Sequence, residues 1–281
     1  MPASPNFSDT QIALTYEVRA VDEAKRVSTI SIPAERPLTV FVDQRELVTL
    51  MTLGAAPEAL TLGYLRNQRL LRSLDELVSI QVDWNKHAAY VTTKQGISNI
   101  EERTAKRVVT TGCGQGSLFG SLMDEVDKIH LPVDARLRQS ALYKIVQKIR
   151  TLDSVYAKAG SVHGCGLFSG DGELLYFIED VGRHNAVDAI AGKMWLDNVD
   201  GSDKAFYTTG RLTSEMVIKG AQMGIPFLIS RSGTTQMGHL VAEKVNMTLL
   251  ARCTGRHFLL VTGKERLVYE PASLDARLKS A

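Results

Sequence analysis

Apolar positions in the C-terminal half of the chain form short runs that alternate with amphipathic stretches. The runs predict strands at residues 165–169, 174–178, 205–208, 227–230, 248–250 and 258–261. Apolar residues at helical spacing predict helices over 184–196, 214–223 and 235–245. This alternation predicts an α/β sheet with helices on both faces and ligands at the carboxyl ends of the strands.

The N-terminal half is richer in strand-like runs. We expect a loosely structured polar arm up to about residue 27, with one strand-like piece at 11–16. Further along, strands are predicted at 38–42, 47–51, 78–82, 88–92 and 106–110. Pro57 opens a predicted helix, and the spacing of apolar residues predicts an amphipathic helix over 137–151.

These patterns divide the chain into four predicted parts. They are an N-terminal arm (1–27), an α+β subdomain (28–112), a mobile cysteine loop and linker (113–135) and an α/β domain (136–281).

The composition limits which ligands and which cellular compartment we expect for this protein. The chain has 281 residues and a net charge of +2, so no overall field attracts nucleic acid. The sequence shows neither an apolar run of about 18 residues nor a secretory signal pattern, so we expect no membrane association. Its three cysteines cannot all pair, which favours the reducing cytoplasm. Local clusters of arginine and backbone amides must therefore hold any anionic ligand.

Cys113 stands out because glycines flank it on both sides, in Thr111-Gly112-Cys113-Gly114. Glycines leave the sulfur unshielded and permit positive φ values, whereas structural cysteines are buried among bulky apolar neighbours. Two interpretations remain open. Cys113 presents its thiol to other molecules, or it is an incidental residue of a strand-to-helix turn.

Polar and titratable residues gather at the end of the predicted strand 174–178, from Glu179 to Asp188. Arg183 is a candidate for binding an anion and His184 for hydrogen bonding or acid–base work, with Asp180 and Asp188 orienting them. In the alternative interpretation, Asp180 caps the helix and the other residues form a salt-bridged network.

Two further strand-to-helix junctions combine glycine, hydroxyls and arginine, and they contain Arg211 and Arg231. Such junctions suit phosphate or another anion, although Ser and Thr there also act as simple caps. More basic donors are predicted between the last two strands, in the segment Arg252, Cys253, Thr254, Gly255, Arg256 and His257. The alternative for this segment is a solvated hairpin turn.

A metal site is not expected. His163 and Cys165 lie two residues apart, but zinc deaminases need H-x-E followed by P-C-x-x-C. Cys165 occupies the glutamate position, and P-C-x-x-C is absent from the sequence. His163 is therefore interpreted as a pocket wall or a satisfied core residue.

The chain resembles the FdhD family of formate dehydrogenase accessory sulfurtransferases. The resemblance begins near residue 35 and rests on segments 37–42, 111–114, 160–163, 179–188, 210–217 and 248–262, in that order. It implies a cytidine-deaminase-like core without zinc, as a mixed sheet with helices on both faces, plus a smaller N-terminal β-rich subdomain.

The resemblance also implies a function. FdhD proteins relay sulfur from a cysteine desulfurase to the molybdenum bis(molybdopterin guanine dinucleotide) cofactor that formate dehydrogenase needs. Cys113 matches the persulfide-bearing cysteine, and residues 252–257 match the cofactor-binding segment. The cofactor is a bound substrate, no tightly bound metal is expected, and the family forms homodimers.

This sequence departs from the family pattern at three positions. The second cysteine of the usual C-x-x-C loop is Gly116, the usual aromatic residue is Arg252 and the usual tyrosine is Val261. Because the cysteine pair is absent, a non-catalytic chaperone that binds the molybdenum cofactor stays open as an alternative. A zinc-dependent nucleotide deaminase is disfavoured by its missing ligands.

Overall fold

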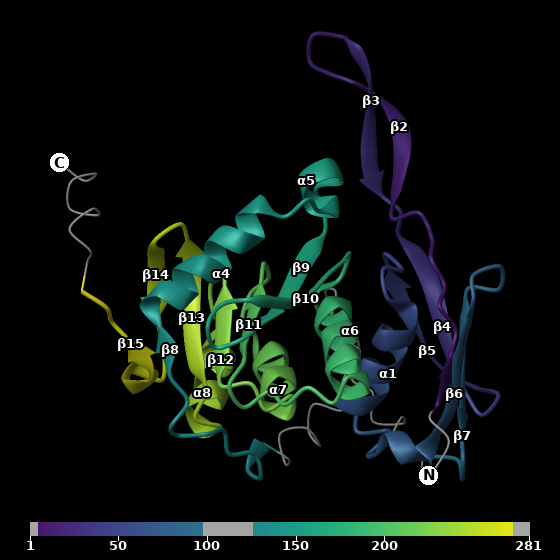
Figure 1. Cartoon of the computed structure of the whole chain (residues 1–281). Coiled ribbons are helices and arrows are strands. Elements are labelled where there is room, and N and C mark those ends of the chain that lie inside the picture. The colour runs from purple at the N-terminus through teal and green to yellow at the C-terminus, as the bar shows by residue number, and fades with distance from the viewer. Residues whose placement is uncertain (1–4, 98–125, 272–281) are drawn as a thin grey trace.

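The computed structural model describes residues 5–97 and 126–271 (Figure 1). Cys113, its glycine loop and the strand predicted at 106–110 lie outside the described residues. None of the described helices combines the length and the apolar character needed to cross a membrane.

The C-terminal half is built around a six-stranded mixed sheet in the order β10-β9-β11-β12-β13-β14. Strands β11, β12 and β13 run parallel, whereas β9, β10 and β14 are antiparallel to their neighbours. The six strands are β9 (His163–Phe168), β10 (Leu174–Asp180), β11 (Ala205–Thr208), β12 (Phe227–Ser230), β13 (Thr248–Thr254) and β14 (His257–Leu260).

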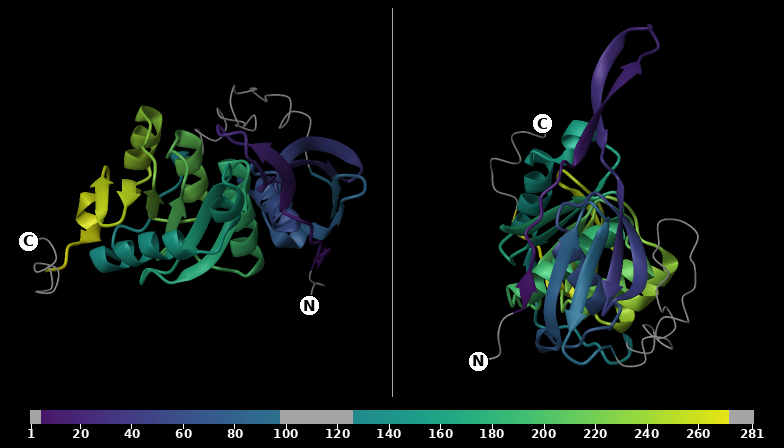
Figure 2. Two further views of the ribbon diagram at one scale, coloured as in Figure 1. Left: turned by 90° about the horizontal axis from the view of Figure 1, so that it is seen from above. Right: turned by 90° about the vertical axis from the view of Figure 1, so that its right-hand side faces the viewer.

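Helices cover both faces of this sheet (Figure 2), as the alternating side chains of its strands require. Ala205 and Tyr207 pack on the side of α4, whereas Phe206 packs on the opposite side with α6, α7 and α8. The helices are α4 (Gln139–Thr151), α5 (Val155–Ala159), α6 (Arg183–Leu196), α7 (Ser214–Gln222) and α8 (Gln236–Lys244). The mixed α/β architecture predicted from the alternation is confirmed, and the likeness to cytidine deaminases stays a prediction.

The N-terminal half contains a five-stranded sheet in the order β1-β6-β7-β4-β5, packed against α1 (Pro57–Asn67). Its strands are β1 (Asn6–Phe7), β4 (Arg36–Val42), β5 (Arg45–Thr52), β6 (Leu77–Asp83) and β7 (Ala88–Thr93). Short elements complete the described chain, namely β8 (Leu137–Arg138) paired with β15 (Leu267–Val268) and two 3₁₀ turns at Leu74–Glu76 and Lys264–Arg266.

The expectation of a loosely structured arm up to residue 27 is wrong. Strands β2 (Thr15–Val21) and β3 (Val27–Pro33) form an antiparallel hairpin that projects from the body (Figure 1). Tyr16 and Val18 lie opposite Ile32 and Ile30 on one side of it, while Glu17 and Arg19 alternate with them. Charged residues alternate with the apolar ones in β2 and its side chains are half-buried or exposed, so no run of buried apolar positions indicates this strand. The hairpin crosses the boundary expected between residues 27 and 28.

Helices α1 and α6 join the two halves through glycines. A Cβ atom on Gly63 would lie 1.7 Å from the carbonyl oxygen of Asp188, and one on Gly192 would lie 2.0 Å from that of Ala59. Only glycine at these positions allows the helix backbones to approach so closely. One hydrophobic core therefore runs from the N-terminal sheet through α1 and α6 into the C-terminal sheet.

Candidate functional site

One edge of the six-stranded sheet collects most of the residues singled out in the sequence. The carboxyl ends of β11, β12 and β13 meet there because these strands are parallel. Strand β9 runs the other way, so it begins at the same edge, where His163 lies opposite Asp180. The edge therefore carries the end of β10, the start of β9 and the three parallel strand ends.

Contacts between the loops connect the arginine-bearing junctions at this edge. The amide of Arg231 donates to the carbonyl of Thr208 (3.2 Å), and the amide of Arg252 donates to that of Ser232 (2.8 Å). A Cβ atom on Gly210 would lie 2.6 Å from Cδ of Arg183, so the Arg183 side chain crosses the glycine that precedes Arg211. The structure thus brings the junctions of Arg183, Arg211, Arg231 and Arg252 together.

A cavity of about 560 Å³ opens beside this edge, between the sheet and helices α4 and α5; we call it the inner cavity. Four predicted site residues line it, namely Arg231, Cys253, Thr254 and Gly255. Its other lining residues are Val146, Ile149, Arg150, Leu152, Ser154, Tyr156, Ala157, Gly164, Phe177, Glu179, Tyr207 and Thr209. Aromatic rings, a hydroxyl and guanidinium groups thus face one space.

The segment from Arg252 to His257 is largely strand rather than a connection between strands. Arg252 to Thr254 belong to β13, His257 begins β14, and the hairpin turn consists of Gly255 and Arg256. Arg252 adopts a left-handed conformation (φ 52°) where the pairing register shifts, and its side chain is exposed, as is that of His257. The Arg256 guanidinium lies over the Tyr143 ring, 5.8 Å from its centroid.

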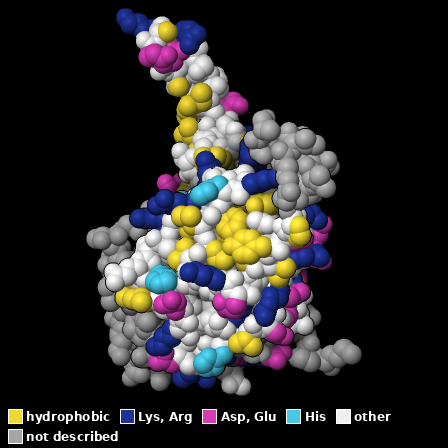
Figure 3. Space-filling view, turned by 90° about the vertical axis from the view of Figure 1, so that its left-hand side faces the viewer, with side chains coloured by type: hydrophobic (Ala, Val, Ile, Leu, Met, Phe, Trp, Pro, Cys, Tyr) yellow, Lys and Arg dark blue, Asp and Glu magenta, His cyan; other side chains and the backbone are white. Residues whose placement is uncertain are grey.

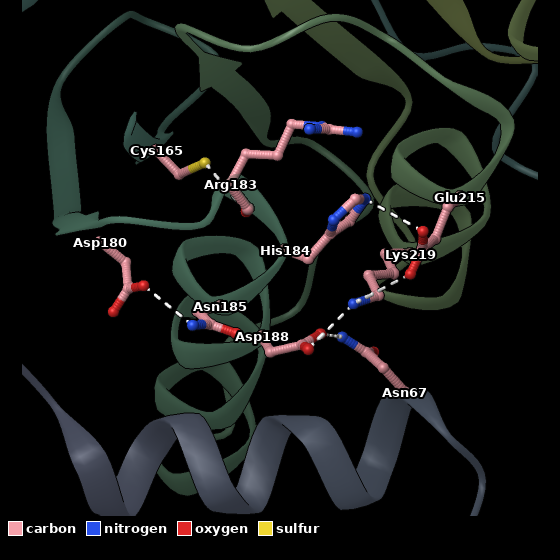
Figure 4. Close-up of polar contacts among 9 residues, drawn as sticks. All are labelled: Asn67, Cys165, Asp180, Arg183, His184, Asn185, Asp188, Glu215 and Lys219. Carbon is pink, nitrogen blue, oxygen red and sulfur yellow. Dashed lines mark hydrogen bonds and ion pairs between the residues drawn. The ribbon is translucent and has the colours of Figure 1, made fainter. Parts of the chain in front are cut away.

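His184 lies in a buried polar network rather than on the wall of the inner cavity (Figure 4). Its Nε2 atom is 3.1 Å from the carboxylate of Glu215. Glu215 also faces Lys219, whose Nζ atom donates to Asp188 (2.9 Å), and Asp188 accepts from the Asn67 amide (2.7 Å). His184 and Asp188 thus belong to a salt-bridged network, as in the alternative interpretation of the segment from Glu179 to Asp188.

Burial and neighbouring charges have opposite effects on the pKa of the Glu215 carboxyl. Burial alone would raise the pKa of its carboxyl, but the hydrogen bond from His184 and the charge of Lys219 bring that pKa below its ordinary value. The ionised carboxylate is therefore the favoured form at neutral pH.

His163 lies at this edge, close to several positively charged side chains. Its half-buried ring contacts the Thr209 hydroxyl (3.3 Å). Burial lowers the pKa of His163, and the nearby charges of Arg183, His184 and Arg211 lower it further. A histidine shifted in this direction is neutral at pH 7. Burial is the main cause of the lowered pKa, and the charges of Arg183 and Arg211 add to it.

Asp180 connects the two halves of the molecule at this edge. Its carboxylate accepts hydrogen bonds from the Thr52 hydroxyl (2.5 Å) and the Leu53 amide (3.0 Å) of the N-terminal half. It also accepts from the Gly182 amide (3.0 Å) and the Asn185 side chain (2.9 Å) at the start of α6. Burial raises the pKa of Asp180 despite these donors. Gly182 is the N-cap of α6, which has no side-chain cap, so the alternative in which Asp180 caps this helix is wrong and the carboxylate instead links the two halves.

Both described cysteines are buried. The thiol of Cys165 contacts Thr208 (3.4 Å), and Cys253 contributes to the inner cavity wall. Burial raises the pKa of each thiol to about 12. The thiol is therefore the favoured form of both cysteines at neutral pH. Within residues 5–97 and 126–271, no three His, Cys, Asp or Glu side chains gather in a way that could hold a metal ion.

The wall formed by α4 and α5 was missed in the sequence. Glu179 was interpreted only as part of a polar strand end, yet its carboxylate accepts from the amides of Val155 (2.6 Å) and Tyr156 (3.0 Å) and so fixes the start of α5. Arg150 lies on the polar side of an amphipathic helix, where a solvated side chain is the usual outcome. No local pattern distinguishes such an arginine from one that lines a cavity.

Comparison with known proteins places this geometry in a family. The FdhD/NarQ family model matches residues 33–268. A protein named Sulfur carrier protein FdhD from Saccharolobus solfataricus is 29% identical over 256 residues, which cover 89% of this chain and 96% of the relative. The protein of the same name from Bacillus licheniformis is 30% identical over 239 residues, covering 84% of this chain and 89% of the relative.

A solved structure agrees with the fold. The crystal structure of a candidate formate dehydrogenase accessory protein from Desulfotalea psychrophila superposes with a TM-score of 0.75 at 24% identity. The match covers 91% of this chain and 100% of that protein. The chain described above therefore belongs to the FdhD/NarQ family.

Proposed function

We propose that this protein is a sulfurtransferase that carries sulfur from a cysteine desulfurase to a molybdenum cofactor for formate dehydrogenase. In this proposal Cys113 holds the sulfur as a persulfide, and the acceptor substrate is molybdenum bis(molybdopterin guanine dinucleotide). The observation that carries the proposal is the convergence of arginine-bearing strand ends beside a cavity with aromatic walls, in a chain of the FdhD/NarQ family.

The inner cavity offers chemistry that suits one end of such a dinucleotide. Phe177 supplies a half-buried ring on which a nucleobase can stack, and Arg231 supplies a fork of donors for phosphate oxygens. Burial is the main cause of the lowered pKa of His163, and the charges of Arg183 and Arg211 at the same edge add to it. A large anionic nucleotide is the ligand class that these features favour.

Elimination among the three cysteines supports Cys113 as the carrier. Cys165 and Cys253 are buried thiols with pKa values of about 12, so only a small fraction is ionised at neutral pH. Cys113 lies outside the described residues, and the glycines on both sides of it in the sequence are what we expect of a thiol that other molecules can reach.

Loading of Cys113 is a thiolate exchange that needs no oxidant. The Cys113 thiolate attacks the terminal sulfur of a persulfide on the donor enzyme. The S–S bond of the donor breaks, its cysteine leaves as a thiolate, and a new S–S bond forms on Sγ of Cys113. The transferred sulfur keeps its oxidation state and its proton, so atoms and electrons balance.

Delivery of the sulfur requires two electrons, because sulfane sulfur becomes a sulfide ligand of the metal. We assign these electrons to a reduced acceptor substrate, in which Mo(IV) becomes Mo(VI) while Cys113 departs as a thiolate. Attack by a second loop cysteine would be another source of the electrons, but this chain has Gly116 at that position. A single cysteine therefore suffices in the proposed cycle.

The proposal is tested by activating formate dehydrogenase in a host that lacks its own carrier. The wild-type protein is expected to restore activity, whereas Cys113→Ala and Cys113→Ser are expected to restore none while they keep the affinity for the nucleotide. Cys165→Ser serves as a matched control for the loss of a thiol, because Cys165 is buried and does not line the inner cavity, and it is expected to retain activity. Full activity with Cys113→Ser would instead support a cofactor-binding chaperone that moves no sulfur.

A further inference from the structure

Helices α6 and α7 both begin at the sheet edge where the arginine junctions meet. Arg183 is the first residue of α6, and Arg211 lies in the loop just before α7. A Cβ atom on Gly210 would lie 2.6 Å from Cδ of Arg183, so the arginine of one helix start lies against the loop that leads to the other. Burial lowers the pKa of His163, and both arginines are close enough to lower it further. The spacing of the two arginines therefore depends on how the two helix starts are held together.

Neither helix start is fixed by a capping side chain, because Gly182 and Thr213 make no side-chain cap hydrogen bond. Instead, His184 in the first turn of α6 faces Glu215 in the first turn of α7, with Nε2 and the carboxylate 3.1 Å apart. The two side chains are only 2% and 14% exposed. A polar contact so shielded from water costs far more to break than an exposed one, so this contact fixes the two helix starts relative to each other.

A second pair of side chains extends the contact one turn further along both helices. Asp188 follows His184 by four residues, and Lys219 follows Glu215 by four, so each helix presents two side chains on one side. The Nζ atom of Lys219 lies 2.9 Å from the carboxylate of Asp188 and 3.8 Å from that of Glu215. The four side chains form a buried chain between α6 and α7 in which acidic groups alternate with the histidine and the lysine (Figure 4).

Glu215 is coupled to the arginine of the other helix as well as to His184. Burial would raise the pKa of the Glu215 carboxyl, whereas the hydrogen bond from His184 and the charges of Lys219 and Arg183 lower it. The charge of Arg183 therefore lies close enough to interact with Glu215. A change at Glu215 is felt first at the end of the buried chain that carries this arginine.

We propose that Glu215 is a positioning residue, which holds the starts of α6 and α7 together through His184 so that Arg183 and Arg211 face one anionic group of the acceptor substrate. This inference rests on the proposed function, in which the acceptor carries phosphates. It assigns a role to a side chain of α7 to which the sequence pattern gave none. Two guanidinium groups held at a fixed spacing bind a phosphate without first having to be ordered, which lowers the entropic cost of binding.

Calorimetric titration of the full chain with GDP and with guanosine tests this role, because only GDP carries phosphates. Glu215→Gln keeps the size of the side chain but removes its charge, and it is expected to weaken GDP about ten-fold and to leave guanosine unchanged. His184→Ala removes the other half of the contact and is expected to have the same effect. Arg183→Ala is expected to weaken GDP at least as much. A variant with both Arg183→Ala and Glu215→Gln is expected to bind GDP as weakly as Arg183→Ala alone, because the spacing of two arginines no longer matters once one is absent.

Two control variants separate positioning from general effects. Lysine and arginine side chains also surround an apolar patch on one face of the molecule (Figure 3), so general attraction of an anion must be told apart from binding at the edge. Arg138→Ala removes an exposed arginine that pairs with Asp171 and is expected to change neither affinity. Asn67→Ala removes a donor to Asp188 at the far end of the same buried network (Figure 4). This variant is expected to lower the melting temperature and to leave the affinity for GDP unchanged.

The outcomes distinguish this role from the function on which it rests. If the wild type binds GDP and Glu215→Gln binds it equally well, or if the losses from Arg183→Ala and Glu215→Gln add in full, Glu215 does not position the arginine and nucleotide binding stands. An equal loss of guanosine affinity, or a loss of GDP affinity in Asn67→Ala as large as in Glu215→Gln, would also overturn the role. If the wild type binds neither ligand, the proposed nucleotide binding is wrong and the positioning role falls with it.

Discussion

At the scale of single residues, the chain places charges where burial would normally exclude them. Lys219, Asp188 and His184 are each at most 1% exposed, and every one contacts a group of opposite charge or complementary polarity. Breaking such a buried pair is costly because it leaves an uncompensated charge. The motif from Glu179 to Asp188 therefore combines an arginine whose side chain crosses Gly210 at the sheet edge with a structural network, and the sequence could not separate these two parts.

Glu215→Gln tests the electrostatic part of this network. Because the folded-state pKa of Glu215 is lowered, its ionisation stabilises the fold above about pH 4.3, and this contribution is lost as the pH falls through the folded-state pKa. The variant is expected to lose about 1–3 kcal/mol at pH 7 and to converge with the wild type in acid. Urea unfolding at a series of pH values measures the difference in unfolding free energy between variant and wild type, both at pH 7 and in acid.

Glu243→Gln is the matched control, because Glu243 also faces a histidine, His239, but is exposed. Its unfolding free energy is expected to stay within about 0.5 kcal/mol of wild type. If the unfolding free energies of the wild type and Glu215→Gln change with pH in the same way, the ionised carboxylate of Glu215 does not stabilise the fold.

At the scale of elements, the periodicity of the C-terminal half predicts nearly every strand and helix of the six-stranded sheet. Strands β11 and β12 have the predicted limits, and α6 begins one residue earlier than expected. Helix α4 falls on the helix predicted over 137–151. The hairpin β2–β3 and the placement of α4 and α5 as a cavity wall were not predicted, because each depends on contacts between distant parts of the chain. Examples are the Glu179 carboxylate at the start of α5 and the pairing of Tyr16 with Ile32.

Gly192→Ala tests the close contact between α1 and α6. At an open helical position this change would stabilise the protein by about 1 kcal/mol. Here the new Cβ atom would lie 2.0 Å from the Ala59 carbonyl oxygen, so the helices must separate, at an expected cost of about 3 kcal/mol. Denaturant unfolding measures the difference in unfolding free energy between Gly192→Ala and the wild type.

Gly233→Ala serves as the comparison, because a Cβ atom there meets nothing within 4 Å and the backbone is not left-handed. Its stability is expected to stay close to wild type. A Gly192→Ala variant as stable as this control would contradict the contact.

At the scale of the whole molecule, the two sheets share one core and one functional edge. Asp180 links them through Thr52 and Leu53, and α1 packs on α6. The sequence predicted that the polar strand ends would meet, because carboxyl ends of parallel strands share one edge. It could not predict that α4 would close a cavity over that edge or that Arg150 would line that cavity.

The central claim is that one cysteine carries sulfur while the arginine-lined edge holds the anionic acceptor. Intact-mass measurement after incubation with a cysteine desulfurase and cysteine tests it most directly. The wild type is expected to gain the mass of one sulfur atom, which dithiothreitol removes, whereas Cys113→Ala is expected to gain none. A sulfur adduct of equal occupancy on Cys113→Ala, or no adduct on the wild type, would contradict the account.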